Sequence, residues 1–194
     1  QEITLPTYPL SHIDDHLGEI ALCILSAVNV GKIRSDEELE ELCDLSVRGL
    51  EELIDYQEYP VKAAELATKA RRSLGVGFIG LAHYLAKLGY KYDSQEAWDA
   101  VHGLSESFQY YLIKSSNEIA KEKGWCENFG RTKYSDGILP IDTYKKDVDE
   151  ICSQPLQHDW ESLRASILEH GLRHSTLSAQ MPSESSSVVS NATN

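Results

Sequence analysis

The chain has 194 residues, 41% hydrophobic and 25% charged, which is typical of a globular domain rather than a disordered segment. Its formal net charge of -13 argues against a nucleic-acid surface, because binding a phosphate backbone needs clustered lysine and arginine. No apolar run reaches the ~20 residues that span a bilayer, and no signal peptide is visible. We therefore expect a cytoplasmic protein that contacts neither nucleic acid nor membrane.

The cysteines and histidines give no sign of a metal site or a disulfide scaffold. Cys23, Cys43, Cys126 and Cys152 lie far apart without a C-x-x-C motif, so reduced thiols are expected. His170 and His174 have a spacing seen in metal motifs, but an intervening glycine is expected to end the helix between them. We predict no bound metal.

The first third of the chain is predicted to hold short strands and one long helix. A strand is expected over residues 2–7. The apolar run 20–30 fits a buried strand continuing into a helix, two structures that periodicity alone does not separate. Ser35 and Glu38 form a capping-box pattern that starts a helix over 36–57. Its apolar side is predicted to contain Leu39, Leu42, Leu45, Leu50, Leu53 and Ile54.

Four more helices are predicted before the end of the chain. They cover residues 61–73, after Pro60, then 76–89 and 94–124, each closed by a glycine, and finally 159–171. A long loop is expected over 125–147. The fold class predicted from this pattern is α/β and helix-rich, with a few strands.

A G-x-G-x-x-G pattern occurs at Gly75, Gly77 and Gly80. The dinucleotide fingerprint needs a strand before the glycines and an acidic residue about 20 positions later. The residues before this pattern are predicted to be helical and basic. Close packing between helices is therefore favoured over nucleotide binding, which stays the minor alternative.

The last twenty residues are predicted to pass from a strand into a helix N-terminus. Residues 175–179 alternate, and Pro182 marks the helix entry. A helix N-terminus presents unpaired N–H groups and the positive end of the dipole, and Ser183, Ser185, Ser186 and Ser187 add hydroxyl donors. These groups are candidates for holding a phosphate or another anion. Glu184 counts mildly against this, and plain N-capping is the alternative.

Two further residues have one structural and one functional interpretation. Cys23 lies within the apolar sequence "ALCIL", where a lone cysteine is usually an inert core residue and less often a redox group. Glu2 lies on a short expected strand. An exposed edge carboxylate there would do nothing specific, whereas a buried one would have a raised pKa and could act as a base.

Several segments, in order, resemble the large (α) subunit of class I ribonucleotide reductases. "STLSAQMPSESSSVVSNATN" is similar to the active-site segment of that family, which has A-x-M-P-[ST]-x-[ST]-[ST] followed by S-N-x-T. "GEIALCILSAVNVGKI" resembles its G-E-[IV]-x-L-C-x-L segment, and "RRSLGVGFIGLAHYLAKLGYKYDS" resembles an intervening helical stretch. The resemblance covers the whole chain and looks strongest to the class Ia enzymes of enteric bacteria and their phages.

The resemblance implies a particular fold and place in a longer protein. The family's catalytic domain is a ten-stranded α/β barrel made of two half-barrels. Residues 1–194 would be a partial catalytic barrel domain, the second half-barrel portion, truncated at both ends. The family's radical cysteine lies in an N-x-C-x-E motif, whose last two positions match Gln1 and Glu2. The cysteine itself would then immediately precede Gln1.

The resemblance also implies roles for individual residues. Glu2 looks like the carboxylate that takes the proton from the substrate 3′-hydroxyl, and Cys23 like one member of the redox pair whose partner lies upstream. The segment formed by Pro182, Ser183, Glu184, Ser185 and Ser186 looks like the loop that binds the substrate diphosphate; the family often has Thr at position 185. The other three cysteines match no functional cysteine of the family and are expected to be structural.

The implied activity is reduction of ribonucleoside diphosphates to 2′-deoxyribonucleoside diphosphates for DNA precursor synthesis. No cofactor is expected to bind this segment itself. The parent enzyme would take its radical from a metal-containing small (β) subunit, respond to ATP and dNTP effectors, and be reduced by thioredoxin or glutaredoxin. The segment would act only with the remainder of the α subunit. The alternative is a non-catalytic helical binding or structural module that keeps the fold without the radical cysteine.

Overall fold

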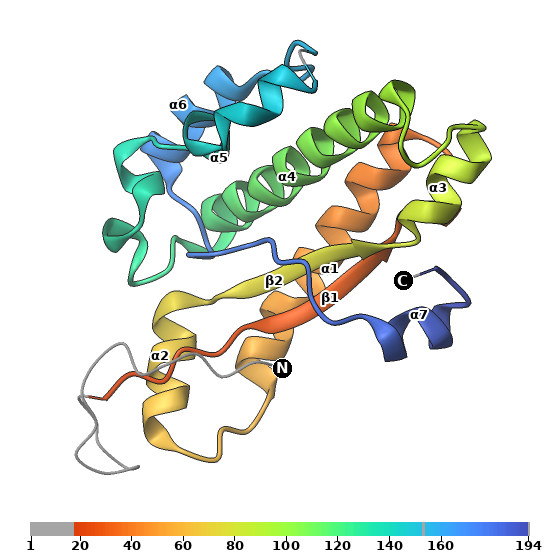
Figure 1. Cartoon of the computed structure of the whole chain (residues 1–194). Helices are drawn as coiled ribbons and strands as arrows, with labels where there is room; N and C mark the ends of the chain where they lie inside the picture. Colours follow the sequence, from red (N-terminus) through yellow and green to blue (C-terminus); the bar gives the residue numbers. More distant parts are fainter. Residues whose placement is uncertain (1–17, 153, 194) are drawn as a thin grey trace.

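The computed structural model describes residues 18–152 and 154–193. Figure 1 shows a small parallel sheet with long helices packed over it and shorter helices around its ends. The strand predicted over residues 2–7, and with it Glu2, lies outside the described residues.

The described sheet is built from two parallel strands, β1 (Ile24–Asn29) and β2 (Leu74–Ile79), paired with Ile24 opposite Leu74. A third extended segment joins β2 through a parallel bridge between Val76 and Ser178. The strand predicted in the apolar run 20–30 is confirmed. The chain leaves this strand through the short 3-10 turn η1 (Val30–Lys32) rather than through a helix.

Helix α1 (Asp36–Tyr56) begins as predicted, with the Ser35 hydroxyl accepting from Glu38 N at 3.3 Å. The reciprocal half of the capping box differs, because the Glu38 carboxylate accepts from Arg34 N at 2.8 Å instead. The predicted apolar face was partly wrong: Leu45 and Leu53 are 57% and 45% exposed. The helical phase places the buried stripe on Leu39, Cys43, Val47, Leu50 and Ile54.

The helix predicted over 61–73 is confirmed as α2 (Lys62–Arg71). The helix predicted over 76–89 was wrong in its first part, because residues 76–79 complete strand β2 and only α3 (Leu81–Leu88) is helical. The buried position of β2, beneath α1 and beside β1, allows the continuous apolar run that looked helical. Gly89, with a φ of 76°, ends α3 as expected.

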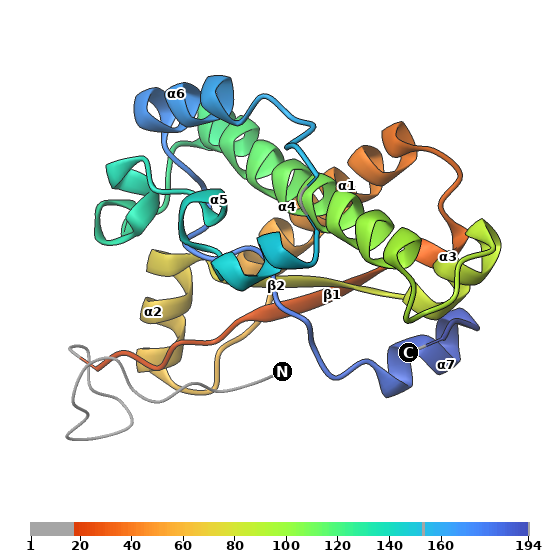
Figure 2. The same cartoon turned by 45° about the horizontal axis from the view of Figure 1, so that its top comes forward.

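The longest helix, α4 (Gln95–Lys123), begins at the Ser94 cap and ends at Gly124 as predicted. It packs along α1, and both helices lie over the sheet (Figure 2). Leu112, Ile113 and Ile119 of α4 are at most 1% exposed within the core.

The expected loop after α4 contains several short helical turns. They are η2 (Phe129–Arg131), η3 (Lys133–Asp136), α5 (Pro140–Thr143) and η4 (Lys146–Glu150). The predicted helix α6 (Trp160–His170) comes next, with the Asp159 side chain capping its start. The Glu106 carboxylate of α4 accepts hydrogen bonds from Gln157 N at 2.8 Å and from Trp160 Nε1 at 3.0 Å, which fixes α6 against α4.

The chain then runs beside β2 and enters α7 (Glu184–Ser190), so the predicted helix is confirmed. The strand predicted before it is reduced to an extended segment with one isolated bridge, between Val76 and Ser178. Helix α7 lies near the carboxyl ends of β1 and β2 (Figure 1). No helix within residues 18–152 and 154–193 combines the length and the apolar character that crossing a membrane requires.

Candidate functional site

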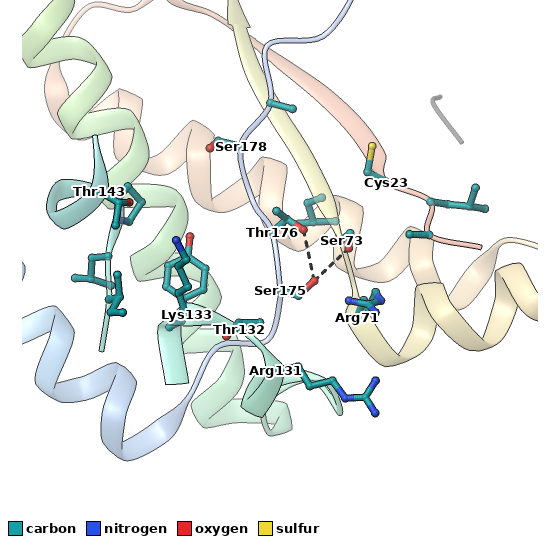
Figure 3. Close-up of a pocket in the computed structure, with 18 residues that line it drawn as sticks. Cys23, Arg71, Ser73, Arg131, Thr132, Lys133, Thr143, Ser175, Thr176 and Ser178 are labelled. Carbon is teal, nitrogen blue, oxygen red and sulfur yellow. Dashed lines mark hydrogen bonds between the residues drawn. The ribbon is translucent and has the colours of Figure 1, made fainter. Parts of the chain in front are cut away.

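Cys23 lies at the start of β1 and lines a cavity of about 640 Å³ (Figure 3). Four parts of the chain meet around this cavity: the entry to β1, the junction of α2 with β2, residues 131–143, and the extended segment 175–179. Residues far apart in the sequence therefore surround one thiol.

Hydroxyl groups form one wall of this cavity. Ser73 Oγ lies 3.2 Å from Ser175 Oγ, which lies 3.5 Å from Thr176 Oγ1. Ser175 N also donates to Arg71 O at 3.0 Å, which holds the extended segment against the end of α2. The wall is thus built from polar groups that are hydrogen-bonded to one another, whereas the Cys23 sulfur points away from them (Figure 3).

Three cationic side chains contribute to the cavity lining: Arg71, Arg131 and Lys133. Arg71 donates to the Glu19 carboxylate at 2.8 Å, and Arg131 lies 3.7 Å from the other oxygen of the same carboxylate. The two arginines therefore share one counter-ion, and the rim of the cavity keeps an excess of positive charge.

The cysteines differ in accessibility. All four are free thiols, and Cys23 is half-buried whereas Cys43, Cys126 and Cys152 are buried. Burial and the nearby Asp36 and Glu40 carboxylates raise the pKa of Cys43 to about 12. Burial also raises the pKa of Cys126 to about 11. Because the thiolate is the reactive form, these raised pKa values make Cys43 and Cys126 poorly reactive, and Cys23 is the most accessible of the four thiols.

The glycine pattern has a structural explanation that differs from the one predicted. Gly75 and Gly77 lie inside β2 rather than in a loop after it, so the nucleotide fingerprint geometry is absent from them. A Cβ at Gly75 would lie 2.5 Å from Leu25 Cδ2, 3.2 Å from Ala179 Cβ and 3.9 Å from Cys23 Sγ. The close packing is therefore between neighbouring extended segments of the sheet, not between helices.

The candidate phosphate loop lies where the chain enters α7. Ser183 is the N-cap residue and is buried, while Pro182, Glu184, Ser185 and Ser186 are exposed. The hydroxyls of residues 185 and 186 are therefore at the surface beside the helix N-terminus. Ser187 differs from the expectation, because it is buried and its hydroxyl donates to Glu184 O at 2.8 Å.

The structure brings some of the predicted residues together and not others. Cys23 and Ala179, which is three residues before the loop, line the same cavity. Pro182 and Ser183 do not line it, so within the described residues the thiol and the loop are neighbours along the sheet rather than members of one pocket. Glu2 lies outside the described residues.

A buried ionic cluster centred on Glu51 was not predicted from the sequence. Arg72, Arg173 and His174 all contact its carboxylate, at 2.7, 2.7 and 3.0 Å. One sequence signal was available: an acidic residue at position 51 lies between Leu50 and Ile54 on the buried stripe of α1. A buried carboxylate requires partners, but the sequence does not say which ones.

Comparison with known proteins gives a consistent result. The family model described as "Ribonucleotide reductase, barrel domain" matches residues 1–194. The ribonucleoside-diphosphate reductase subunit alpha of Haemophilus influenzae is 60% identical over 193 residues, which cover 100% of this chain and 26% of that protein. The corresponding protein of phage T4 is 45% identical over 195 residues, covering 100% of this chain and 25% of that protein.

A third relative, ribonucleoside-diphosphate reductase 1 subunit alpha of Escherichia coli, is 58% identical over 141 residues, covering 73% of this chain and 18% of that protein. The chain thus spans at most about a quarter of the length of these relatives. The described parallel strands, with helices packed over them, fit part of an α/β barrel. The chain belongs to the ribonucleotide reductase family, as a helix-rich segment of its barrel domain.

Proposed function

We propose that this chain is part of a catalytic subunit that reduces ribonucleoside diphosphates to 2′-deoxyribonucleoside diphosphates by thiyl-radical chemistry. The observation that carries the proposal is the placement of Cys23: a free, half-buried cysteine immediately before β1 that lines a cavity together with Arg71, Arg131 and Lys133. The names of the relatives support the same substrate class.

In the proposed reaction the residues have separate tasks. A thiyl radical on a cysteine upstream of Gln1 removes the 3′-hydrogen of the ribose. Glu2 accepts the 3′-hydroxyl proton, which makes departure of the neighbouring 2′-hydroxyl as water easier. Cys23 and a second upstream cysteine then supply two electrons and two protons, and they become a disulfide. The first cysteine returns the 3′-hydrogen, which regenerates its thiyl radical, and Glu2 returns the proton to the 3′-oxygen.

The loop from Pro182 to Ser186 is proposed to hold the substrate diphosphate. Its support is the position of these residues at the start of α7, with the Ser185 and Ser186 side chains exposed. Backbone N–H groups and hydroxyls can bind a phosphate without a cationic side chain. This suits a chain with a net charge of -13.

The partners follow from the same proposal. The segment acts with the remainder of the α subunit and with a radical-generating β subunit that carries the metal centre. ATP and dNTP effectors act on other parts of the parent enzyme, and thioredoxin or glutaredoxin returns the disulfide to thiols. We propose that this assembly works in the cytoplasm.

Replacing Glu2 by glutamine in the complete α subunit tests the proposal. The amide keeps the shape of the side chain but cannot accept the proton, so nucleotide reduction should fall by roughly 100-fold or more, in the range found for a missing general base. Thermal unfolding should be unchanged. Glu2→Asp, which keeps the carboxylate, should retain part of the activity.

Near-normal turnover by the Glu2→Gln subunit would show that Glu2 is not the general base of the reaction. The non-catalytic alternative has its own test, which is the codon before Gln1 in the parent gene. A cysteine codon there supports a working reductase, and any other residue in an intact reading frame supports a binding or structural module.

A further inference from the structure

The extended segment that leads to α7 stops pairing with β2 just before the candidate phosphate loop. Val76 N donates to Leu177 O at 2.8 Å, and Ala179 N donates to Val76 O at 3.2 Å. Pro182 comes three residues later and has no N–H to continue a ladder. Another group must therefore fix the direction in which the main chain leaves the sheet.

The Gln180 side chain supplies that group. Its Nε2 donates to Phe78 O at 2.7 Å, and its Oε1 accepts from Phe78 N at 3.4 Å. The carboxamide thus bonds both backbone groups of one residue, as a neighbouring strand would. It replaces one rung of the sheet and leaves the main chain of residues 180–182 free to turn toward α7.

Gly77 provides the space for this arrangement. A Cβ at Gly77 would lie 2.4 Å from Ala179 O, 2.7 Å from Met181 Cε and 3.0 Å from Gln180 Oε1. The first of these atoms belongs to the backbone and cannot rotate away. Any side chain at position 77 would push the segment off β2 at the point where Gln180 binds.

The far end of α7 is attached to the same part of the fold. Lys32 Nζ donates to Ser190 O at 2.8 Å, and Gly80 N donates to Thr193 O at 2.8 Å. The loop between Gln180 and α7 is therefore held from both sides by β2 and the turns that come after the two strands. Figure 1 shows this course of the chain from the extended segment into α7.

We propose that Gln180 is a positioning residue for the substrate loop: its carboxamide, seated over Gly77 on the backbone of Phe78, sets where Pro182–Ser186 stand relative to the sheet. This inference rests on the proposed function of that loop. Gln180 itself touches no reacting atom, so its effect is on substrate affinity rather than on the chemical step.

The test uses the complete α subunit with its radical-generating partner and a ribonucleoside diphosphate as substrate. Gln180→Met keeps the length of the side chain and removes both hydrogen bonds. Gln180→Glu keeps the acceptor but places a carboxylate oxygen against Phe78 O. Gln154→Met makes the same change at an exposed glutamine in the segment before α6 and is the matched control.

We expect Gln180→Met to raise KM roughly three- to tenfold, the size expected for two lost hydrogen bonds at an exposed site. The kcat should stay within about twofold of the wild-type value, because no interaction special to the transition state is removed. Gln180→Glu should raise KM at least as much. The temperature of unfolding should be unchanged in both variants, and Gln154→Met should match the wild type throughout.

Two further variants separate this inference from the function on which it rests. Ser183→Ala and Ser185→Ala change the loop itself and should raise KM if it binds the diphosphate. If they raise KM while Gln180→Met does not, the positioning role of Gln180 is overturned. If neither serine variant changes KM, the loop assignment fails and the inference fails with it.

Discussion

His174 Nε2 lies 3.0 Å from Glu51 Oε2, and both side chains are almost fully buried, at 0% and 1% exposed. The other ring nitrogen, Nδ1, lies 2.9 Å from Ser116 Oγ, and that oxygen also accepts the His174 backbone N–H at 3.1 Å. The hydroxyl proton is thus available to Nδ1, and Nε2–H donates to the carboxylate. These contacts fit a neutral His174 that carries its proton on Nε2.

The same carboxylate also binds two arginines. Arg72, the residue between α2 and β2, donates through Nε to Glu51 Oε2 at 2.7 Å, and Arg173 donates through Nε to Oε1 at 2.7 Å. Arg72 adopts a left-handed conformation with a φ of 50°. The order Ser–His–carboxylate occurs in hydrolases, but here the three side chains are closed to solvent. The cluster therefore holds α1, α4, the start of β2 and the segment before α7 together.

Glu51→Gln should lower the stability of the barrel domain strongly. The change breaks the buried ion pair with Arg72 and leaves that guanidinium with Asp55, whose side chain is 54% exposed, as its carboxylate partner. Breaking a buried ion pair costs about 3–5 kcal/mol. Glu52→Gln, at the adjacent residue, is the matched control. The Glu52 side chain is 72% exposed, and an exposed ion pair such as the one it makes with Lys123 contributes little to stability. Calorimetry of the complete subunit should show a large drop in unfolding temperature for the first variant and almost none for the second.

His174 should make stability depend on pH. Burial lowers its pKa below the usual 6.5, although the hydrogen bond with Glu51 works in the opposite direction. Below about pH 6.5 the unfolded chain binds a proton that the folded protein does not, so stability is lost as the pH falls, by up to about 1.4 kcal/mol per pH unit.

His174→Asn should remove this contribution, whereas the half-exposed His170, changed to asparagine, should leave it in place. The measurement is the unfolding temperature of each variant between about pH 7 and pH 5. Parallel curves for His174→Asn and the wild type would show that His174 binds its proton equally in the folded and unfolded states, and so that burial does not lower its pKa.

The four cysteines should react with a thiol reagent in a fixed order. Cys23 is half-buried, while Cys43 and Cys126 are 0% and 1% exposed and have raised pKa values. Maleimide labelling of the reduced subunit, followed by peptide mass spectrometry, should modify Cys23 first and reach Cys43 and Cys126 only on unfolding. Labelling of Cys43 at the rate of Cys23 in the folded protein would contradict this packing.

The sequence predicted those parts of the fold that local chemistry determines. Capping serines and terminal glycines placed the ends of α1, α3 and α4, because these residues satisfy or terminate a helix by themselves. The apolar pattern over residues 76–79 predicts a helix where the structure has the end of strand β2, because an apolar run buried between neighbours shows neither the helical nor the strand period. Its true neighbours, β1 and the segment near Ser178, lie about 50 and 100 residues away in the chain.

In the candidate site, too, the sequence indicates individual residues but not the contacts that depend on distant parts of the chain. The resemblance to a family pointed to Cys23 and to Pro182–Ser186, and the structure places Cys23 in a cavity and the loop at a helix start. It did not point to Glu51, because the partners of that carboxylate come from two other parts of the chain, at position 72 and at positions 173 and 174. Nor did it point to Gln180, whose role depends on which backbone lies beside it.

Replacing Cys23 by serine in the complete α subunit is the most direct test of the central claim. With thioredoxin and the radical-generating partner present, the variant should fail to sustain repeated turnovers, because serine cannot form the disulfide that thioredoxin reduces. Cys152→Ser, a change at a buried thiol outside the Cys23 cavity, should cycle like the wild type. If the Cys23→Ser subunit cycles normally, Cys23 is only a packed residue and the proposed role of this segment is wrong.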